Sequence, residues 1–323
     1  MKKTLLKLLQ PLLSKCGLQL QRTSDYDRQH EREQLLEQVI NVPVRHSAPL
    51  QLQFIVFSKD RALQLHGLLS SLLQNVTGNF TLHVLYHASS EEHQKAYNEV
   101  RHLFSKKTDW QWTKENNFRA NLIQILENSH STEICFLVDD IVFIRPINLD
   151  TIDWDTYSKG ILSLRLGKGI TFCYTKQKSM AVPPLKVVNT NDKMLQFQWG
   201  ASDYDWAYPL SVDGHIFPTH EIQVAVKELN YSAPNSFERA LQRLSPLYSK
   251  RPGYCFASPR LLNIPLNRVQ DEVDNCSGDI CPEKLLARWN EGLTLHWREL
   301  SNIKTESVHK EVPVKFSPRQ TSL

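Results

Sequence analysis

Three short apolar runs in the first half of the chain have the length and composition of buried β-strands. Polar residues bound each run, as is typical of strands that are covered on both faces. Segments with helical spacing lie between them, each with apolar residues on one face. The predicted strands are residues 52–57, 81–86 and 134–138, and the predicted helices lie near residues 65–72, 90–104 and 118–126.

This alternation of strands and helices predicts the fold class. Its order is strand, helix, strand, two helical stretches and strand, which is typical of an α/β protein with a mostly parallel sheet and helices on its faces. In such sheets, ligands bind beyond the carboxyl ends of the strands. Ser58 and Asp139 each directly follow a predicted strand, so we expect both at that edge.

The second half of the chain is less regular. Asp213-Gly214 lies between two apolar runs, 208–212 and 215–217, and predicts a tight hairpin. Further strands are predicted at 161–165 and 195–199, and helices near 219–229, 236–244 and 282–291. We therefore expect one domain with two halves, 51–165 and 166–300, preceded by a segment 1–20 and a linker 21–50 and followed by a tail 301–323.

Composition narrows the class of protein. The chain has 323 residues and a net charge of +4, and it contains no basic stripe with interleaved aromatic residues. Nucleic acid is therefore not an expected partner. Neither a phosphate-binding P-loop nor a dinucleotide-binding GxGxxG fingerprint occurs. Cys276 and Cys281 share a polar loop and could form a disulfide or bind metal, but two reduced thiols in a cytoplasmic protein are the favoured interpretation.

The first 20 residues form a basic amphipathic pattern. Leu5, Leu8, Leu9 and Leu12 share one helical face, and lysines and polar residues share another. Such a helix can lie on an anionic membrane surface, so peripheral contact with the cytoplasmic face of a membrane is one interpretation. Docking on the protein's own body is the other, because Pro11 limits an isolated helix.

Asp139 and Asp140 are the main candidates for chemistry. They follow the strand 134–138 directly, and apolar sequence resumes at once. Two neighbouring buried carboxylates are costly unless a cation lies beside them. A hard ion such as Mg²⁺ or Mn²⁺ takes one or two protein carboxylates and completes its shell with substrate phosphates. The alternative is that the pair forms only a turn or a helix cap.

The block from Asn117 to Phe143 resembles the donor-binding half of GT-A glycosyltransferases. The resemblance rests on a strand that ends in a DxD-like motif and on an upstream helix that opens with Arg119 and Asn121. The first strand and the loop after it are also similar to the first strand and nucleotide-binding loop of that family. In this chain the loop residues are Ser58, Lys59, Asp60 and Arg61.

The resemblance implies a Rossmann-like GT-A fold, a nucleoside diphosphate sugar as donor, and a Mn²⁺ or Mg²⁺ ion. Asp140 would be the direct metal ligand, and Asp139 would face the ribose or a metal-bound water. His296, which ends a late apolar run, is the candidate for a further metal ligand, with an ordinary hydrogen-bonded histidine as the alternative. The motif departs from the family pattern because it carries no acidic residue at Val138 or Ile141.

An inverting transferase needs a carboxylate base that deprotonates the acceptor hydroxyl. Glu238 is the first candidate because it lies near a late helix start, and Asp205 and Asp213 follow it. The spacing of Asn235 and Glu238 also matches a capping box, which would give Glu238 a purely structural role.

Together these features predict an enzyme that moves a sugar from a nucleoside diphosphate sugar to a hydroxyl of a carbohydrate or lipid-linked acceptor. A sugar-phosphate nucleotidyltransferase shares the fold, but the chain lacks the Gly-rich loop that usually follows its first strand. A non-catalytic relative that binds sugar or a partner through the same cleft is the remaining alternative.

Overall fold

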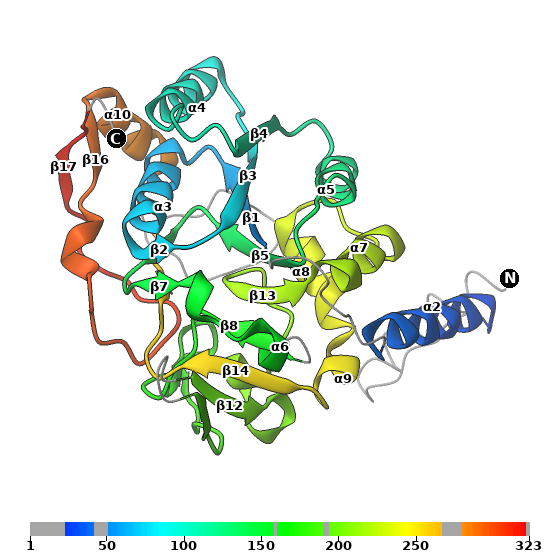
Figure 1. Ribbon diagram of the computed structural model, residues 1–323. Coiled ribbons are helices and arrows are strands. Elements are labelled where there is room, and N and C mark those ends of the chain that lie inside the picture. Colours follow the sequence, from blue (N-terminus) through cyan, green and yellow to red (C-terminus); the bar gives the residue numbers. More distant parts are fainter. Residues whose placement is uncertain (1–22, 42–50, 158–159, 190–193, 267–279, 321–323) are drawn as a thin grey trace, which may run out of the picture. The chain divides into compact units, whose positions relative to one another are not determined.

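The computed structural model describes residues 23–41, 51–157, 160–189, 194–266 and 280–320 (Figure 1). The chain divides into two units, residues 1–42 and residues 43–323. In the first unit the structure describes one helix, α2 (Thr23–Asn41), within the predicted linker; the segment 1–20 lies outside the described residues. The helices of the second unit are α3 (Ala62–Asn75), α4 (Glu91–Leu103), α5 (Phe118–Glu127), α6 (Trp154–Tyr157), α7 (Thr219–Glu228), α8 (Pro234–Gln242), α9 (Ser245–Tyr248) and α10 (Pro282–Asn290).

A nine-stranded sheet forms the centre of the second unit. In spatial order its strands are β11 (Lys186–Asn189), β12 (Met194–Gln198), β14 (Pro252–Phe256), β8 (Ile161–Ser163), β13 (His215–Pro218), β5 (Glu133–Val138), β1 (Leu52–Lys59), β3 (Phe80–His87) and β4 (Trp110–Lys114). All of them except β12 and β13 run in the same direction. The prediction of an α/β fold with a mostly parallel sheet is confirmed.

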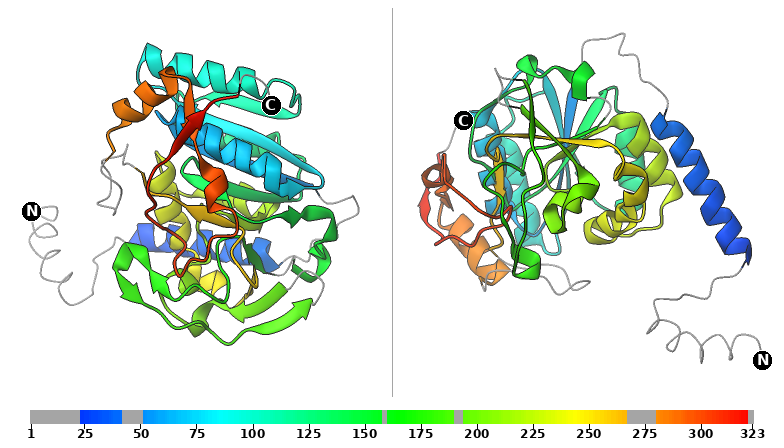
Figure 2. Two further views of the ribbon diagram at one scale, coloured as in Figure 1. Left: turned by 90° about the vertical axis from the view of Figure 1, so that its left-hand side faces the viewer. Right: turned by 90° about the horizontal axis from the view of Figure 1, so that it is seen from below.

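Helices cover both faces of this sheet, as Figure 2 shows. On one face Phe54 and Val56 of β1 belong to the same buried cluster as the leucines of α3 and the apolar side of α4. On the other face Phe57 packs edge-on against Phe118 of α5, with ring centroids 5.1 Å apart, and stacks on Phe136 of β5 at 5.5 Å. Both faces of β1 are therefore buried, which explains its mostly apolar sequence.

Among the described residues, four small sheets of two strands each lie outside the large sheet. One of them lies next to the carboxyl end of β5. It pairs β6 (Ile141–Phe143) with β15 (Leu261–Asn263), and a β-bridge joins Asn263 to His309. Another joins two late strands beside α3 (Figure 1). The other pairs are β16 (Leu293–Leu295) with β17 (Phe316–Pro318), β9 (Phe172–Cys173) with β10 (Lys178–Ser179), and β2 (Val76–Thr77) with β7 (Ile147–Asn148).

The strand order creates a switch point between β1 and β5. From β1 the chain proceeds outward through β3 and β4, and it then returns to place β5 on the opposite side of β1. Crevices at the carboxyl ends of strands that diverge in this way are the usual ligand sites of open α/β sheets. Ser58–Arg61 and Asp139–Asp140 lie at these two strand ends.

The predicted hairpin around Asp213-Gly214 is wrong. Residues 208–212 form turns, and only the second arm is a strand, β13, which pairs with β5 and β8. Gly214 has a φ of +79°, and a Cβ there would lie 2.4 Å from a methyl carbon of Leu261. The turn therefore requires glycine, and it places Asp213 at the carboxyl edge of β5.

Candidate active site

Asp139 is an anchor that joins the end of β5 to the end of β1. Its Oδ2 accepts hydrogen bonds from the Ser58 hydroxyl at 2.8 Å and the Lys59 backbone N–H at 3.2 Å. Its Oδ1 accepts from Nη1 of Arg61 at 2.9 Å. Burial raises the pKa of Asp139, and the Arg61 charge opposes that rise. Both oxygens of this carboxylate are thus committed to the protein.

The loop that follows β1 is held from several sides. The Ser58 hydroxyl also bonds to the Tyr97 hydroxyl at 2.7 Å, and the Arg61 N–H donates to the same Tyr97 oxygen at 3.1 Å. Asp60 has a φ of +54°, a conformation that aspartate tolerates, and its Oδ1 accepts from the Ser89 N–H at 2.8 Å. The chain thereby turns sharply into α3, which starts at Ala62 with no side-chain cap.

Asp140 is less fully committed than Asp139. Its Oδ1 accepts from Nδ2 of Asn263 at 2.9 Å, and its Oδ2 lies 3.4 Å from Nη1 of Arg61. Burial, together with the negative charges of Asp139 and Asp213, raises the pKa of Asp140 to about 7, although Arg61 opposes the shift. The side chain is 12% exposed, so a ligand can reach it.

A cluster of charged side chains around Asp213 lies near Asp140. Arg165, which follows β8, donates to Asp205 Oδ1 at 2.9 Å and lies 3.4 Å from Asp213 Oδ2. His309 Nε2 lies 3.6 Å from the same Asp213 oxygen. Burial tends to raise the pKa of Asp213, but His309 and Arg165 outweigh it and leave the pKa below its ordinary value. Asp213 is therefore a weak proton acceptor.

Glu238 is better suited to act as a base. Its Oε1 accepts from the Ser211 hydroxyl at 2.9 Å and from the Val212 N–H at 3.1 Å. Burial and the nearby charge of Asp213 raise its pKa to about 6. Within the described residues no hydrogen bond reaches its Oε2. A carboxylate of this kind is ionised at neutral pH and still accepts a proton readily.

The capping-box interpretation of Glu238 is wrong. α8 begins at Pro234, so Asn235 lies inside the first turn instead of at the N-cap. The hydroxyl of Ser236 accepts the Ala233 N–H at 2.9 Å, and it thereby replaces the cap that the sequence assigned to Asn235 and Glu238. Glu238 instead reaches back to the turn that precedes Asp213.

Two residues expected near the donor diphosphate have other partners. Arg119 donates to the carbonyl oxygens of Lys227 at 2.6 Å and Leu229 at 3.2 Å, so its guanidinium caps the carboxyl end of α7. Asn121 Oδ1 accepts the backbone N–H groups of Asn116 and Asn117 and shapes the turn before α5.

Among the described residues, no contact joins His296 to Asp139 or Asp140. His296 follows β16, whose Thr294 bonds to His66 of α3. Its side chain is 37% exposed, and its Nε2 lies 3.9 Å from the carboxylate oxygen Oε1 of Glu299. The histidine whose charge acts on Asp140 is His309. The proposed ligand role of His296 therefore has no contact in its support.

Several contributors to the site were not identified from the sequence. Arg165 and Asn263 each end or follow a short strand, and a charged or amide side chain at a strand's carboxyl end could have suggested them. His309 lies in the predicted tail, and no local pattern indicates it. It reaches the site because residues 308–310 lie along Asn263, with the Asn263 N–H donating to the Val308 oxygen at 3.1 Å.

The side chains of the site provide only some of the ligands that a divalent ion needs. Among the described residues, no group of three or more His, Cys, Asp or Glu side chains is arranged to hold a metal. Asp140 nevertheless offers one buried carboxylate with unused lone pairs and a raised pKa. Mg²⁺ and Mn²⁺ sites that also use substrate phosphates need only one or two protein carboxylates. Asp140 therefore fits as the protein ligand of such a site.

Comparisons with known proteins find distant similarities among solved structures. No protein-family model matches the chain, and no curated protein sequence matches it. Among solved structures, S. aureus TarS 1–349 aligns with 13% identity and a TM-score of 0.40, over 64% of this chain and 58% of that one. The same fragment in complex with UDP gives 12% identity and a TM-score of 0.41, again over 64% of this chain and 58% of that one.

A third similar structure is that of WbbM, a bifunctional glycosyltransferase. It aligns with 12% identity and a TM-score of 0.37, over 70% of this chain and 40% of that one. The chain thus spans less than two thirds of each of these proteins. Scores this low do not establish which residues of this chain correspond to residues of those proteins.

Proposed function

We propose that this chain transfers a sugar from a nucleoside diphosphate sugar to a hydroxyl acceptor. The observation that carries the proposal is the position of Asp140. It is a buried carboxylate with a pKa of about 7 and unused lone pairs, located at the switch point between β1 and β5. Burial makes the ionised form of this acid costly for the fold at neutral pH, whereas a cation-bound diphosphate would use its charge.

The donor would bind against the loop Ser58–Arg61 and the start of α3. The first backbone N–H groups of α3 have no side-chain cap and no acidic residue in the first turn, so they favour an anion. Arg61 adds a guanidinium at the same place. When bound, Mn²⁺ or Mg²⁺ supplies Lewis-acid stabilisation of the departing diphosphate, and Asp140 would hold it.

The acceptor would bind on the side of Glu238. Its Oε2 would take the proton from the acceptor hydroxyl, while Ser211 and the Val212 N–H fix the other oxygen. Arg165 and His309 keep Asp213 ionised, and that charge raises the proton affinity of Glu238. The carboxylate of Glu238 is thereby adjusted to work near neutral pH.

The test is nucleotide release from a panel of UDP-, GDP-, CDP- and dTDP-sugars, with and without Mn²⁺ and with carbohydrate and lipid-linked acceptors. We expect metal-dependent release with one class of donor, and its loss in Asp140→Asn. The matched control is Asp203→Asn, which removes an exposed carboxylate and should retain activity.

Other outcomes would contradict the proposal. Consumption of a nucleoside triphosphate together with a sugar phosphate would identify a nucleotidyltransferase. Donor binding without release under any of these conditions would identify a non-catalytic protein. Equal activity of Asp140→Asn and Asp203→Asn would remove the role of Asp140.

A further inference from the structure

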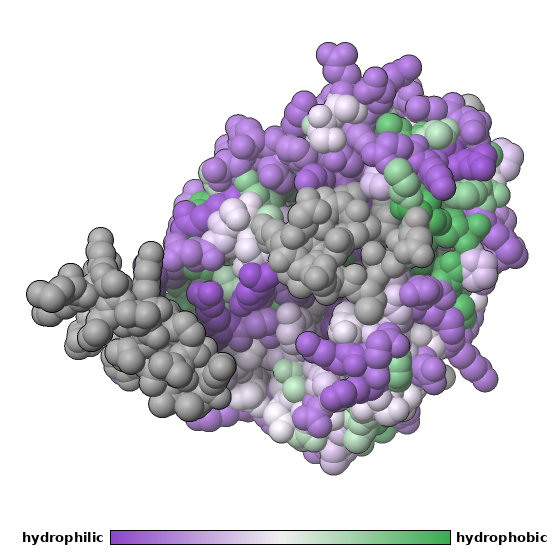
Figure 3. All heavy atoms as spheres, turned by 180° about the vertical axis from the view of Figure 1, so that it is seen from behind, coloured by the Kyte–Doolittle hydropathy of each residue, from purple (hydrophilic) through white to green (hydrophobic). Residues whose placement is uncertain are grey.

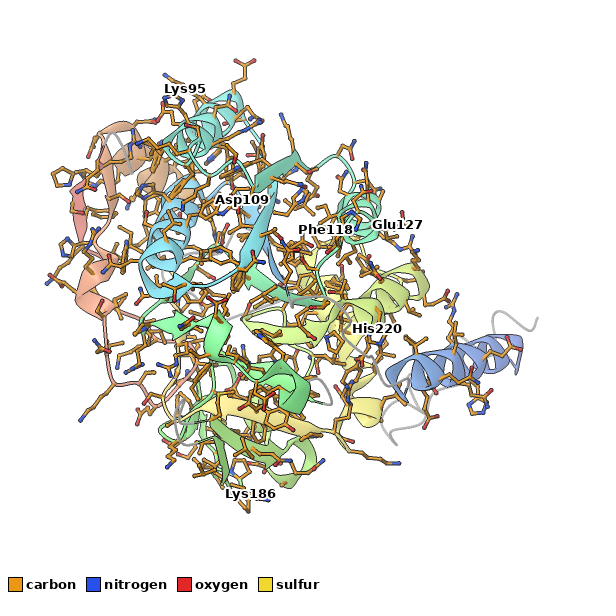
Figure 4. All side chains as sticks on the ribbon, viewed as in Figure 1. Lys95, Asp109, Phe118, Glu127, Lys186 and His220 are labelled. Atoms are coloured by element: carbon orange, nitrogen blue, oxygen red, sulfur yellow. The ribbon has the colours of Figure 1, made fainter. Side chains whose placement is uncertain are left out.

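A cavity of about 520 Å³ lies between α5 and the face of β1, β3 and β4. It is distinct from the charged site, because it is lined by the first residues of β1 whereas the site follows the last. Gln53 and Ser58 are five residues apart on β1, which corresponds to roughly 17 Å at about 3.3 Å per residue. Figure 4 labels the lining residue Asp109, just before β4, and Phe118 and Glu127, the first and last residues of α5.

Amide and hydroxyl side chains dominate the lining. They include Gln53, Thr81, Gln111, Thr113 and Asn121. Neither lysine nor arginine occurs among the described residues that line the cavity, and the one acid is the exposed Asp109. His83 is also present and is bonded to Thr113 at 2.8 Å; burial lowers its pKa to about 4, so it is neutral at physiological pH.

One lining atom has no partner. Gln53 is only 7% exposed, and its side-chain oxygen Oε1 makes no hydrogen bond within the described part of the chain. A buried amide oxygen without a donor is costly and rare in native proteins. Thr81 and Gln111 lie on the same sheet face as Gln53 and His83, because the register pairs Gln53 with Thr81 and His83 with Gln111.

We propose that this cavity binds an uncharged, hydroxyl-rich ligand, namely a neutral sugar or polyol. A ligand hydroxyl would donate to Gln53 Oε1, and the surrounding amides and hydroxyls would satisfy the other hydroxyl groups. The volume falls within the roughly 300–1,000 Å³ of small-molecule sites. The lining disfavours nucleotides and sugar phosphates, because it contains neither lysine nor arginine to offset their charge. This site is independent of the proposed transferase activity.

The full chain is tested by saturation-transfer NMR with glucose, galactose, N-acetylglucosamine and ribitol, and with glucuronate as the charged counterpart. At least one neutral compound should bind, more tightly than glucuronate, and an excess of UDP should not displace it. Gln53→Leu should lower the affinity by about tenfold, the effect of one lost hydrogen bond to a buried group. Gln94→Leu, on α4 and outside the lining, is the matched control.

Two further readouts keep the test decisive. Gln53→Leu removes an unsatisfied polar atom, so its melting temperature should not fall; if it does not fold, Gln111→Ala at the exposed edge strand replaces it. The proposal is overturned if none of the four neutral compounds binds, if UDP displaces the bound one, or if Gln53→Leu binds as well as Gln94→Leu. Sugar binding that depends on Gln53, without nucleotide release from any of the UDP-, GDP-, CDP- and dTDP-sugars, would support this cavity and reject the transferase.

Discussion

The substitution Asp140→Asn tests the electrostatics of the site without any knowledge of the substrate. Folding raises the pKa of Asp140 from 3.8 to about 7, mainly through burial and then through the charges of Asp139 and Asp213. The folded protein therefore holds a proton that the unfolded chain releases near pH 4. Stability from this group is complete below about pH 4 and is lost as the pH rises through about 7.

The size of the effect follows from the same shift. One pKa unit corresponds to about 1.4 kcal/mol, so the rise from 3.8 to about 7 sets an upper limit of about 4 kcal/mol. The limit is not reached in full, because the charges of Asp139 and Asp213 act on Asp140, so protonation of one group changes the titration of the others. At about 2 °C per kcal/mol for a domain of this size, the melting temperature of wild type would fall by up to about 8 °C relative to the variant.

The assay is thermal unfolding of both proteins between pH 4 and pH 8 at constant ionic strength with a chelator present. We expect the melting temperature of Asp140→Asn minus that of wild type to rise with pH. Asparagine still accepts from Asn263, so the contact at Oδ1 is kept. Asp203→Asn should give a difference that is independent of pH. A flat difference for Asp140→Asn as well would refute the account of its pKa.

Ligand addition extends the same experiment to the metal. A ligand at about 100 times its dissociation constant stabilises the folded state by about 2.7 kcal/mol, or about 5 °C here. UDP with Mn²⁺ should shift wild type more than UDP alone, and the extra shift should grow with pH because the metal competes with the proton on Asp140. An undiminished extra shift in Asp140→Asn would show that the ion binds elsewhere.

Three further predictions concern other parts of the chain. Glu238→Gln keeps an oxygen for the Ser211 hydroxyl but removes the base, so turnover should fall by roughly 10²- to 10⁴-fold and lose its decline below about pH 6; near-normal turnover would leave Glu238 a structural role. His309→Ala removes a partner of Asp213, so a carboxyl resonance of Asp213 in ¹³C NMR should titrate at higher pH than in wild type, and an unchanged titration would exclude that coupling. Removal of residues 1–20 should abolish sedimentation with anionic vesicles, and equal sedimentation of both chains would assign that segment to the protein body.

The strands and helices near the switch point were predictable because their sequence signals are local. β1, β3 and β5 are mostly apolar runs bounded by polar residues. The starts of α4 and α5 follow Ser90 and Asn117, whose side chains accept N–H groups of the first turn. β4 was missed because it is short, lies at the sheet edge and alternates tryptophan with polar residues.

The predicted hairpin failed for a reason that local sequence does not show. Residues 208–212 are apolar enough to be a strand, but β13 uses its two edges to pair with β5 and β8, so no edge remains for them. Their backbone groups bond to side chains instead. The Pro209 carbonyl bonds to the His215 ring, and the Val212 N–H donates to Glu238. The turn residues Asp213 and Gly214 were recognised correctly, whereas their partners were not.

The exposed side chains of the described residues give no comparable indication of function. Hydrophilic residues dominate the face shown in Figure 3. Among the described residues, the large hydrophobic side chains that are exposed are Leu35 and Val187. The described helices also include none that is long and apolar enough to cross a membrane. Buried polar groups are therefore more informative about this protein than its exposed apolar ones.

The two adjacent aspartates illustrate what the sequence could and could not show. The two residues lie in the turn between β5 and β6, and the fold gives their side chains different partners. Asp139 is saturated by Ser58, Lys59 and Arg61, whereas Asp140 contacts Asn263 of β15 and retains unused lone pairs. The sequence identified the pair, but the difference between them depends on Asn263, 123 residues away from Asp140 in the chain. Only the residue that the fold leaves incompletely bonded is available for a ligand, and this asymmetry is why Asp140, and not Asp139, is the position at which the function can be tested.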